Sequence, residues 1–405
     1  MVKNLNTDVT IIGGGLLGGT LSCALASGGL RSIVIERQSI DQQQENLFDI
    51  RTTALALTGK KMMESLGLWS DLDSRVTPIL GIRVAEERSH CFLHFNHDDI
   101  ATEALGYMVE NLFLRRAVFN GISRYPDIKY IEKTEVLGFS CERDGVQTFL
   151  SDGRCVNSAL IIGADGRNSF VRRQTDIPIT KWSYNQTAIV CTVEHKKCHH
   201  NIAHELFFSP GPLAILPLEG NRSSVVWTEK NDYAAEVMKL KDSDFRFELF
   251  RRIGDFLEPV RIVGPRSTYP LHLQYAREST RLRLALAGDA AHALHPIAGQ
   301  GFNMGLRDVA ALAEVLVEAY RLGLDVGEST TLKKYERWRR FDNTLMIAAT
   351  DSLNWLFSNN TFPLQVVRRL GLAAVNLSGP LKKIFMRQAM GLTGKVPSLM
   401  KGEQL

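Results

Sequence analysis

Three glycines near the N-terminus have the spacing of a phosphate-binding turn. Gly13, Gly15 and Gly18 form the pattern G-x-G-x-x-G within the stretch DVTIIGGGLLGGTLSCALASGG. In such a turn the first glycine allows a tight bend, the second lets a pyrophosphate approach the backbone, and the third lets the following helix pack on the preceding strand. The N–H groups at the start of that helix face the phosphates. The spacing therefore predicts a dinucleotide-binding site.

An acidic residue stands where a dinucleotide site needs one. Glu36 comes eighteen residues after Gly18, in the stretch RSIVIER, and Arg37 ends that stretch. A carboxylate there accepts hydrogen bonds from the hydroxyls of an adenosine ribose. The arrangement requires a strand at residues 8–12, a helix at about residues 16–27 and a second strand before the acid. We expect Glu36 and Arg37 to bind the cofactor, although this pattern alone does not distinguish FAD from NAD.

Two later segments carry further candidate site residues. ALIIGADGRNSFVRR places Asp165 and Gly166 after an apolar strand, and RLALAGDAAHALHPIAGQGFNMGLRD places Asp289 after another. The carboxyl end of a buried strand is where open α/β sheets hold ligands. A glycine-rich loop that begins at Pro296 then leads into a helix that is amphipathic over about residues 305–320. In isolation, the Asp-Gly pair is an ordinary turn and the later aspartate is a helix cap.

Together with the N-terminal turn, these segments resemble the three motifs of the single-component flavoprotein aromatic hydroxylases, which share the fold of p-hydroxybenzoate hydroxylase. The resemblance implies that the cofactor is FAD and that Asp289 binds its ribityl chain. It also implies that Asp165 and Gly166 contribute to binding the pyrophosphates of FAD and the pyridine nucleotide, and that Pro296 opens the flavin loop. The N–H groups of that loop would face the flavin edge where negative charge accumulates on reduction, and they belong to Gly301, Phe302 and Asn303.

The sequence outside these motifs resembles that of the ubiquinone-biosynthesis hydroxylases, which add hydroxyl groups to a prenylated phenol. The resemblance rests on FDIRTTALA, GYMVENLFLRRAV, GPLAILPL and ATDSLNWLFSN, and it covers nearly the whole chain. It implies a prenylated phenol as substrate, O2 as co-substrate, NAD(P)H or another reductant, and oxygen transfer through a flavin C4a-hydroperoxide. Arg51 and Arg115 match family positions near the flavin. As isolated residues, both would be solvated surface arginines.

Candidates for the substrate pocket lie in the apolar stretch LFFSPGPLAILPLEG and beside the flavin loop. Leu213, Ile215 and Pro217 belong to a strand that would form a wall on the active face of the flavin, and an apolar wall suits a prenylated ring. The same apolar pattern would also be expected if these residues were simply buried in the core of a sheet. His295 lies next to the flavin loop, where the adjacent Pro296 indicates a role in shaping the loop at least as much as a catalytic role. The sequence identifies no general base.

The order of the motifs predicts an α/β fold with a Rossmann-like FAD-binding domain, an inserted sheet-rich substrate domain and a helical C-terminus. We expect the discontinuous FAD-binding domain to comprise residues 1–75, 105–180 and 275–330. The substrate domain would comprise residues 76–104 and 181–274, and the helical region residues 331–405. No second G-x-G-x-x-G occurs, so NAD(P)H is not expected to have a domain of its own.

Composition narrows the functional class. A net charge of +4 without a long basic run argues against nucleic-acid binding. Six cysteines without a CxxC pair fit a reducing, cytoplasmic setting. No apolar run approaches the ~20 residues of a membrane span, and glycines interrupt the first apolar run, which argues against a secretory signal. The cluster from His90 to Asp99 contains zinc-ligand types, but they alternate faces on a strand without a distant complementary pair, so no metal is expected.

Other interpretations stay open. The segment LQVVRRLGLAAVNLSGPLKKIFMRQAMG mixes apolar and basic residues. It is either a helix docked on the core or a surface that contacts the inner face of a membrane or other quinone-biosynthesis proteins. The rival functions are hydroxylation of a small soluble aromatic acid and a structural role as a flavin-bound subunit of a biosynthetic assembly. The ring position that is hydroxylated and the oligomeric state are not determined by the sequence.

Overall fold

The computed structural model describes residues 4–44, 51–86, 92–294, 299–358, 375–376 and 378–405. One half is built on a six-stranded sheet in the order β19-β20-β13-β2-β3-β9, in which all neighbours from β20 to β9 are parallel. The strands are β2 (Val9–Ile12), β3 (Ser32–Ile35), β9 (Ile128–Ile131), β13 (Leu160–Gly163), β19 (Thr280–Arg281) and β20 (Leu284–Leu286). The central strands are buried on both faces, as parallel strands covered on both sides require.

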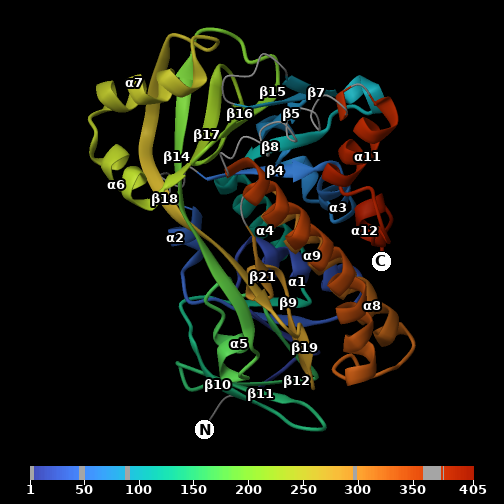
Figure 1. The fold of residues 1–405 in the computed structure, drawn as a ribbon. Helices are drawn as coiled ribbons and strands as arrows, with labels where there is room; N and C mark the ends of the chain where they lie inside the picture. The colour runs from blue at the N-terminus through green and yellow to red at the C-terminus, as the bar shows by residue number, and fades with distance from the viewer. Residues whose placement is uncertain (1–3, 45–50, 87–91, 295–298, 359–374, 377) are drawn as a thin grey trace.

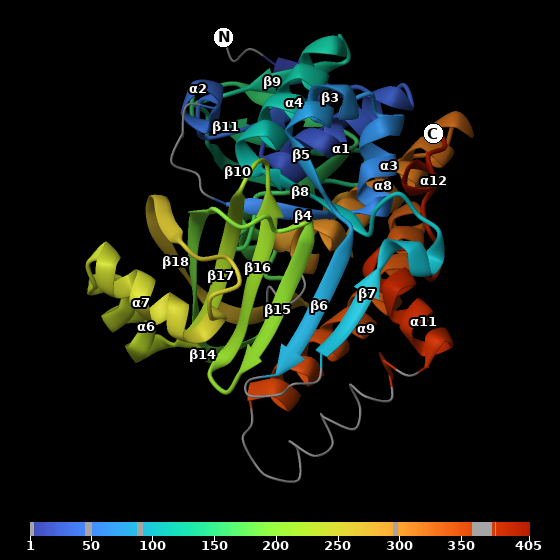
Figure 2. The ribbon, with the colours of Figure 1, turned by 90° about the horizontal axis from the view of Figure 1, so that it is seen from above.

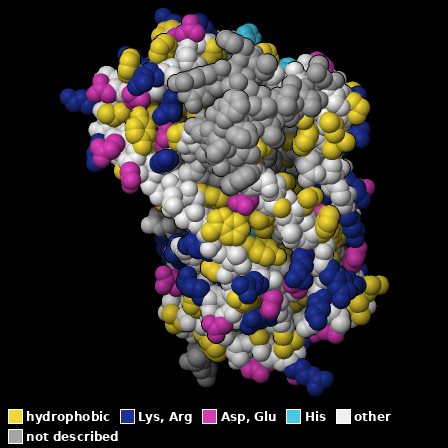
Figure 3. All heavy atoms as spheres, in the orientation of Figure 1, with side chains coloured by type: hydrophobic (Ala, Val, Ile, Leu, Met, Phe, Trp, Pro, Cys, Tyr) yellow, Lys and Arg dark blue, Asp and Glu magenta, His cyan; other side chains and the backbone are white. Residues whose placement is uncertain are grey.

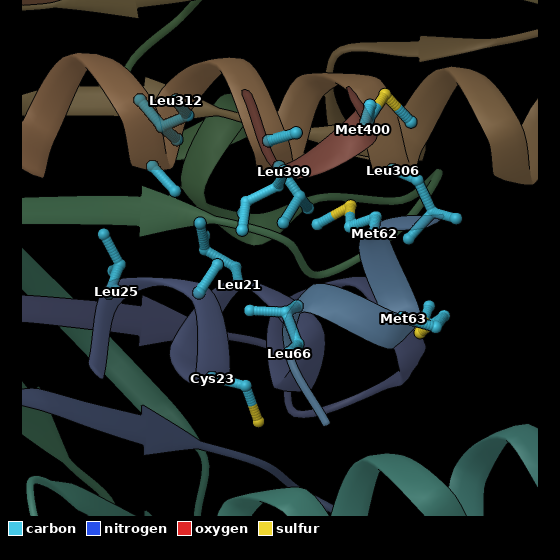
Figure 4. Packing of buried hydrophobic residues seen from close by; sticks show 14 of the residues in the cluster. Leu21, Cys23, Leu25, Met62, Met63, Leu66, Leu306, Leu312, Leu399 and Met400 are labelled. Carbon is cyan, nitrogen blue, oxygen red and sulfur yellow. The ribbon is translucent and has the colours of Figure 1, made fainter. Parts of the chain in front are cut away.

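Helices cover one face of this sheet. They are α1 (Leu16–Ser27), α3 (Leu57–Ser65), α4 (Asn111–Arg124), α8 (Gln300–Arg321) and α12 (Ser398–Lys401). On this face, the side chains of Val9 and Ile11 of β2 pack with apolar side chains of the helices in one hydrophobic core. Figure 4 shows the leucines and methionines that α1, α3, α8 and α12 contribute to it. α1 has the bounds expected from the sequence, because the glycine-rich turn precedes it and Gly28 caps its C-terminus.

The opposite face of the parallel sheet packs on a smaller sheet. Its strands, in the order β1-β12-β11-β10, are β1 (Asn4–Asn6), β12 (Cys155–Ser158), β11 (Val146–Leu150) and β10 (Val136–Cys141). Ile12 and Ile161 point to this side, where they meet Leu150 and Val156. The alternation along β2 thus divides its side chains between two cores.

The other half is built on an eight-stranded sheet in the order β21-β18-β14-β17-β16-β15-β6-β7. The strands are β6 (Gly81–Glu86), β7 (Phe92–Asn96), β14 (Ile179–His195), β15 (Ile202–Phe208), β16 (Gly211–Leu218), β17 (Arg222–Lys230), β18 (Val260–Ala276) and β21 (His292–Ala293). α6 (Asn231–Lys239) and α7 (Asp242–Ile253) cover its outer face, as Figure 2 shows. The long strands β14 and β18 run from this sheet towards the other half of the molecule (Figure 1).

The remaining elements lie between or outside the two halves. A three-stranded sheet is formed by β4 (Thr52–Ala56), β8 (Gly106–Glu110) and β5 (Val76–Ile79). The C-terminal region contributes α9 (Ser329–Ser358) and α11 (Gly379–Ala389). The short elements are α2 (Ile40–Gln44), α5 (Phe170–Gln174), η1 (Trp69–Asp71), η2 (Asp73–Arg75), η3 (His97–Ile100) and η4 (Gly288–Ala290). No helix in the described ranges is long and apolar enough to cross a membrane.

The predicted fold class is confirmed, with a parallel α/β half, a sheet-rich half and a helical C-terminal region. The expected domain bounds stay predictions. β14 and β18 cross between the halves without interruption, so a boundary within either strand is not marked by a break in secondary structure.

Candidate active site

A cavity of about 1670 Å³ extends from the parallel sheet to the inner face of the eight-stranded sheet. Helices α8, α9 and α11 contribute to its wall. Sites for one drug-sized ligand occupy about 300–1,000 Å³, so this cavity has room for a cofactor and a second molecule. One end is lined by glycines and charged residues. The other end, which we call the apolar chamber, is lined chiefly by apolar side chains, including Ile82, Val84, Leu93, Phe95, Ala203, Phe207, Pro212, Ala214, Leu216 and Val226.

The glycine turn lies at the charged end, and its three glycines have different surroundings. Gly13 adopts a φ of +98°, and a Cβ there would lie 2.5 Å from the carbonyl oxygen of Ala164. A Cβ on Gly18 would lie 1.9 Å from the carbonyl oxygen of Gly13. A Cβ on Gly15 would meet nothing within 4 Å, because this residue faces the cavity. The turn thus combines tight packing with one exposed backbone position, the geometry that a close phosphate contact needs.

Glu36 follows β3 and lies beside the glycine turn. Its Oε2 accepts a hydrogen bond from the N–H of Gly14 at 2.8 Å, and its Oε1 accepts one from the N–H of Gln38 at 2.9 Å. Each carboxylate oxygen has further lone-pair sites. Glu36 and Arg37 both line the cavity. The N–H groups of Gly14 and Gln38 therefore hold the Glu36 carboxylate in place at the cavity. Its remaining lone pairs are available to accept hydrogen bonds from a ribose.

Asp165 connects the second motif to the same end of the cavity. Its Oδ2 accepts hydrogen bonds from the N–H groups of Phe170 and Val171, at 2.6 and 3.2 Å, at the start of α5. Its Oδ1 is buried and has no hydrogen-bond partner within the part of the chain that the structure describes. A buried acceptor without a partner is costly unless a ligand satisfies it. Asp165 and Gly166 both line the cavity, and a ligand hydroxyl would suit this oxygen.

Asp289 lies in η4, directly after β20, and lines the cavity. Two anchors fix this turn. Arg172 of α5 donates hydrogen bonds to the carbonyl oxygens of Ala290, at 2.6 Å, and Arg167, at 2.8 Å. On the other side, Asp308 of α8 accepts a hydrogen bond from the N–H of Gly288 at 3.0 Å. The sequence placed Asp289 at a strand end but did not reveal either anchor.

The anchor at Asp308 is a fully buried charged network. Its Oδ2 lies 2.6 Å from Nε2 of His292, and its Oδ1 accepts a hydrogen bond from Nε of Arg339 at 2.7 Å. Burial alone would raise the pKa of Asp308, but the charges and hydrogen bonds of His292 and Arg339 outweigh it and lower the pKa to about 2. Arg339 also donates to Asp342 and Asn343, each at 2.7 Å. In the sequence, this network is indicated by the position of Asp308 on the apolar face of an amphipathic helix.

The N-terminus of α8 completes the charged end. Gly299 precedes the helix with a φ of +62°, and Gly301, Phe302 and Asn303 line the cavity. The N–H groups of a first helical turn have no partners within the helix. The Asn303 side chain accepts from the N–H of Ala56 at 2.9 Å and donates to the carbonyl of Ala54 at 2.8 Å, which ties α8 to β4. Pro296 and His295 lie outside the described residues.

The two family-matched arginines also line the cavity. Arg115 of α4 is buried, with 8% of its surface exposed, so the alternative of a solvated surface arginine is wrong for this residue. Arg51 precedes β4 and is exposed. With Arg37, Arg167 and Arg173, five arginines of the described ranges line the cavity.

The apolar chamber uses the face of β16 opposite to the expected one. Pro212, Ala214 and Leu216 line the chamber. Leu213 and Ile215 instead join the core beneath α6 and α7 with Phe245 and Leu249, and Pro217 is buried without lining the cavity. Both faces of this strand are covered, one by helices and one by the chamber. The apolar run therefore lacks the alternation that would have indicated its orientation.

Two ionisable residues of β15, His204 and Glu205, lie at the apolar chamber. Glu205 of β15 lines the cavity between Ala203 and Phe207, and burial raises its pKa to about 7. Its neighbour His204 packs its ring at 4.6 Å from that of Phe256, beneath the helical side of the sheet. Burial, with the nearby charges of Arg83 and His94, lowers the pKa of His204 to about 4. The sequence gave no sign of Glu205, because no local motif surrounds it.

Two described members of the histidine and aspartate cluster, His97 and Asp99, contact other parts of the protein. Nδ1 of His97 lies 2.8 Å from the carbonyl oxygen of Thr102, and Asp99 pairs with Lys382 of α11 at 2.8 Å. Among the described residues, no group of three metal-ligand side chains is gathered. His90 and Cys91 lie outside the described residues.

Both the sequence and the fold are similar to those of known proteins. The family model described as FAD binding domain matches residues 6–348. The chain is 48% identical over 401 residues to ubiquinone hydroxylase UbiL of Rhodospirillum rubrum, covering 98% of this chain and 93% of that protein. It is 31% identical over 394 residues to 3-demethoxyubiquinol 3-hydroxylase of Escherichia coli, covering 96% and 100%. The solved structure of p-nitrophenol 4-monooxygenase PnpA from Pseudomonas putida shares the fold, with a TM-score of 0.80, 18% identity, and coverage of 97% and 100%. The chain therefore belongs to the ubiquinone-biosynthesis hydroxylases, FAD-dependent monooxygenases with the fold of p-hydroxybenzoate hydroxylase.

Proposed function

We propose that this enzyme hydroxylates the aromatic ring of a polyprenyl phenol intermediate in ubiquinone biosynthesis, with O2 as co-substrate and NAD(P)H as reductant. The observation that carries the proposal is the continuity of the cavity, in which a glycine turn and the start of α8 share one space with the apolar chamber. The printed functions of the relatives from Rhodospirillum rubrum and Escherichia coli support the same substrate class.

The residues at the charged end fit FAD. Glu36 would bind the adenosine ribose, and the exposed backbone at Gly15 before α1 would accommodate the pyrophosphate. Oδ1 of Asp165, which is buried without a protein partner in the described ranges, would suit a hydroxyl group of the cofactor, and Asp289 lines the same cavity. The N-terminus of α8 offers N–H donors and a positive dipole end to the flavin edge. Bound FAD, reduced by NAD(P)H, supplies the activated oxygen that an electron-rich ring carbon accepts.

The apolar chamber favours a prenylated phenol over a small aromatic acid. Its lining residues from the eight-stranded sheet include neither lysine nor arginine. A benzoate carboxylate would therefore lack a cationic partner on this wall and would meet Glu205. Burial of an anion without a partner is costly, whereas each buried CH2 group of a prenyl chain contributes about 0.8 kcal/mol.

We further propose a cytoplasmic enzyme that works at the inner face of the membrane. Leu381, Ile384 and Phe385 of α11 are exposed, and Phe385 also lines the cavity. Figure 3 shows hydrophobic side chains gathered at this edge of the molecule. Because Lys383 lies on the same helix, contact with an anionic lipid surface or with another quinone-biosynthesis protein is supported by both charge and hydrophobicity. Salt-sensitive binding to anionic liposomes tests this proposal, and its absence together with no binding to those proteins would refute it.

The activity itself is tested with purified, FAD-loaded protein. The assay supplies NADH or NADPH, ¹⁸O2 and either a prenylated phenol or a benzoate, and mass spectrometry follows the product. We expect one ¹⁸O atom in the prenylated product and little turnover of benzoate. Asp289→Ala should lose the product, whereas Asp144→Ala, at an exposed hairpin tip, should retain it. Retained product formation in the Asp289 variant would favour a structural role for the flavin site.

A further inference from the structure

Glu205 is oriented towards the apolar chamber by the register of its sheet. Side chains alternate along β15, so Ala203, Glu205 and Phe207 share one face, and all three line the cavity. Glu205 is paired with Val84 of β6 on one side and Ala214 of β16 on the other. Both partners also line the cavity. The three neighbouring strands therefore surround the Glu205 carboxyl with mostly apolar side chains.

Among the charged residues of the neighbouring strands that the structure describes, Glu86 of β6 lies on the same face as Glu205, two residues beyond Val84 and paired with Phe207. Arg83 of β6 is paired with His204, and both belong to the opposite face of the sheet. β16 presents Ala214, and α9 lines the cavity with Met346, Ala349 and Thr350. Asp351, the next residue of α9, accepts a hydrogen bond from the hydroxyl of Tyr184 at 3.0 Å. Burial is the cause that raises the pKa of Glu205 to about 7, the range in which a carboxylate is an effective base at neutral pH.

The wall that carries Glu205 adjoins the start of α8. A Cβ on Gly299 would lie 3.1 Å from Cβ of Ala54. Ala54 packs in turn with Ala203 and Leu216, which lie on the wall around Glu205. The chamber is therefore next to the helix N-terminus at which we place the flavin.

We propose that Glu205 is a catalytic base, which binds the phenolic hydroxyl of the substrate and removes its proton. This inference rests on the proposed function. The phenol O–H bond breaks, its proton moves to a carboxylate oxygen of Glu205, and the electron pair stays on the phenol oxygen and enriches the ring. A ring carbon then forms a C–O bond to one atom of O2, whose second atom leaves as water at the expense of two electrons from NAD(P)H. The same carbon releases its hydrogen as a proton, and Glu205 returns its proton to the product phenolate.

Glu205→Gln tests the proposal, because it keeps the shape of the side chain and removes its basicity. We expect kcat/KM for the prenylated phenol to fall about 100-fold or more, within the range for loss of a general base. The wild-type rate should rise with pH around 7, and the variant should lose this dependence. Glu194→Gln, which changes an exposed carboxylate on β14, is the matched control and should behave as wild type. A Glu205→Gln variant within tenfold of wild type, or with the wild-type pH profile, would overturn the proposal.

Two readouts separate a base from a structural residue. A fluorinated prenylated phenol, ionised in solution at the assay pH, should restore most of the Glu205→Gln rate, because it needs no base. In the oxidised enzyme without turnover, a bound nitrophenol should show the absorbance of its anion with wild type and of its neutral form with Glu205→Gln. Glu205→Asp, which keeps a titrating carboxyl, should retain a pH-dependent rate. Lack of rescue by the fluorinated phenol, or identical nitrophenol spectra, would contradict the role.

Failure of the proposed function would look different. If wild type bound FAD but hydroxylated no prenylated phenol, the substrate class would be wrong whatever the behaviour of the Glu205 variants. If wild type formed the product and Glu205→Gln formed it equally well, the function would stand and the base would be wrong. The two claims therefore fail on different measurements.

Discussion

Asp308 of α8 accepts a hydrogen bond from the backbone N–H of Gly288 at 3.0 Å, and this bond holds the turn that carries Asp289 at the cavity. The same carboxylate receives a hydrogen bond from Arg339 of α9 at 2.7 Å. A buried charged network, with side chains at most 2% exposed, thus links the C-terminal region to a residue expected to bind the cofactor. The network stabilises the position of this turn rather than contacting a ligand itself.

Removal of the Arg339 guanidinium should destabilise the buried network around Asp308. Arg339→Met leaves the charge of Asp308 buried with one cation fewer, so the free energy of unfolding should fall by about 3–5 kcal/mol. The affinity for FAD should fall as well, because Asp289 loses its support. Thermal unfolding and the FAD content of the purified protein measure both effects. Arg340→Met, on the exposed side of the same helix, is the control, and equal behaviour of the two variants would contradict the account.

The glycine turn allows packing to be separated from cofactor binding. A Cβ on Gly18 would lie 1.9 Å from a backbone oxygen, so Gly18→Ala should destabilise the protein and weaken FAD binding. A Cβ on Gly15 meets no protein atom within 4 Å, and its φ of −71° suits alanine. Gly15→Ala should therefore keep the melting temperature of the FAD-free protein while the Kd for FAD rises at least tenfold. Unchanged FAD affinity in Gly15→Ala would place the pyrophosphate elsewhere.

The two faces of β16 should respond differently to substitution. Ala214→Phe adds volume to the chamber and should raise KM for long prenyl chains more than for short ones, with little change in stability. Leu213→Ala removes buried carbons beneath α6 and α7 and should cost about 2–5 kcal/mol of stability with chain-length preference unchanged. Steady-state kinetics with substrates of several chain lengths and urea unfolding test the pair. The reverse pattern would mean that the chamber lies on the helical side.

Glu205 should make stability depend on pH. Its pKa is raised from 4.5 to about 7 in the folded protein, so the folded state favours the neutral acid. The resulting stability is complete below pH 4.5 and is lost as pH rises through about 7. Glu205→Gln should therefore match wild type near pH 4.5 and exceed it by about 3 kcal/mol at pH 8. Unfolding of the substrate-free holoenzyme at both pH values decides this, and a pH-independent difference would refute it.

The sequence predicted those features that depend on local pattern. The turn from Gly13 to Gly18, the helix from Leu16 and the positions of Glu36, Asp165 and Asp289 after strands follow from spacing and strand order. These are short-range relationships, so one segment of chain contains the information. The family resemblance added the cofactor in the same way, because its motifs are contiguous.

The remaining site residues depend on which face of a strand or helix meets which neighbour. Glu205 faces the chamber only because β15 pairs with β6 and β16 in one particular register, and that pairing is long-range. The error at Leu213 and Ile215 has the same origin, since a shift of one residue exchanges the faces of a strand. Asp308 could have been suspected from its place on an apolar helix face, but its partner Arg339 belongs to another helix.

The central claim, hydroxylation of a polyprenyl phenol, is tested most directly in cells. Quinone intermediates are profiled by mass spectrometry in cells that carry the gene, lack it, or carry the Asp289→Ala variant. We predict that cells without the active enzyme accumulate a prenylated phenol that lacks one hydroxyl group, and its structure will identify the ring carbon. An unchanged quinone profile in cells without the gene would contradict the claim.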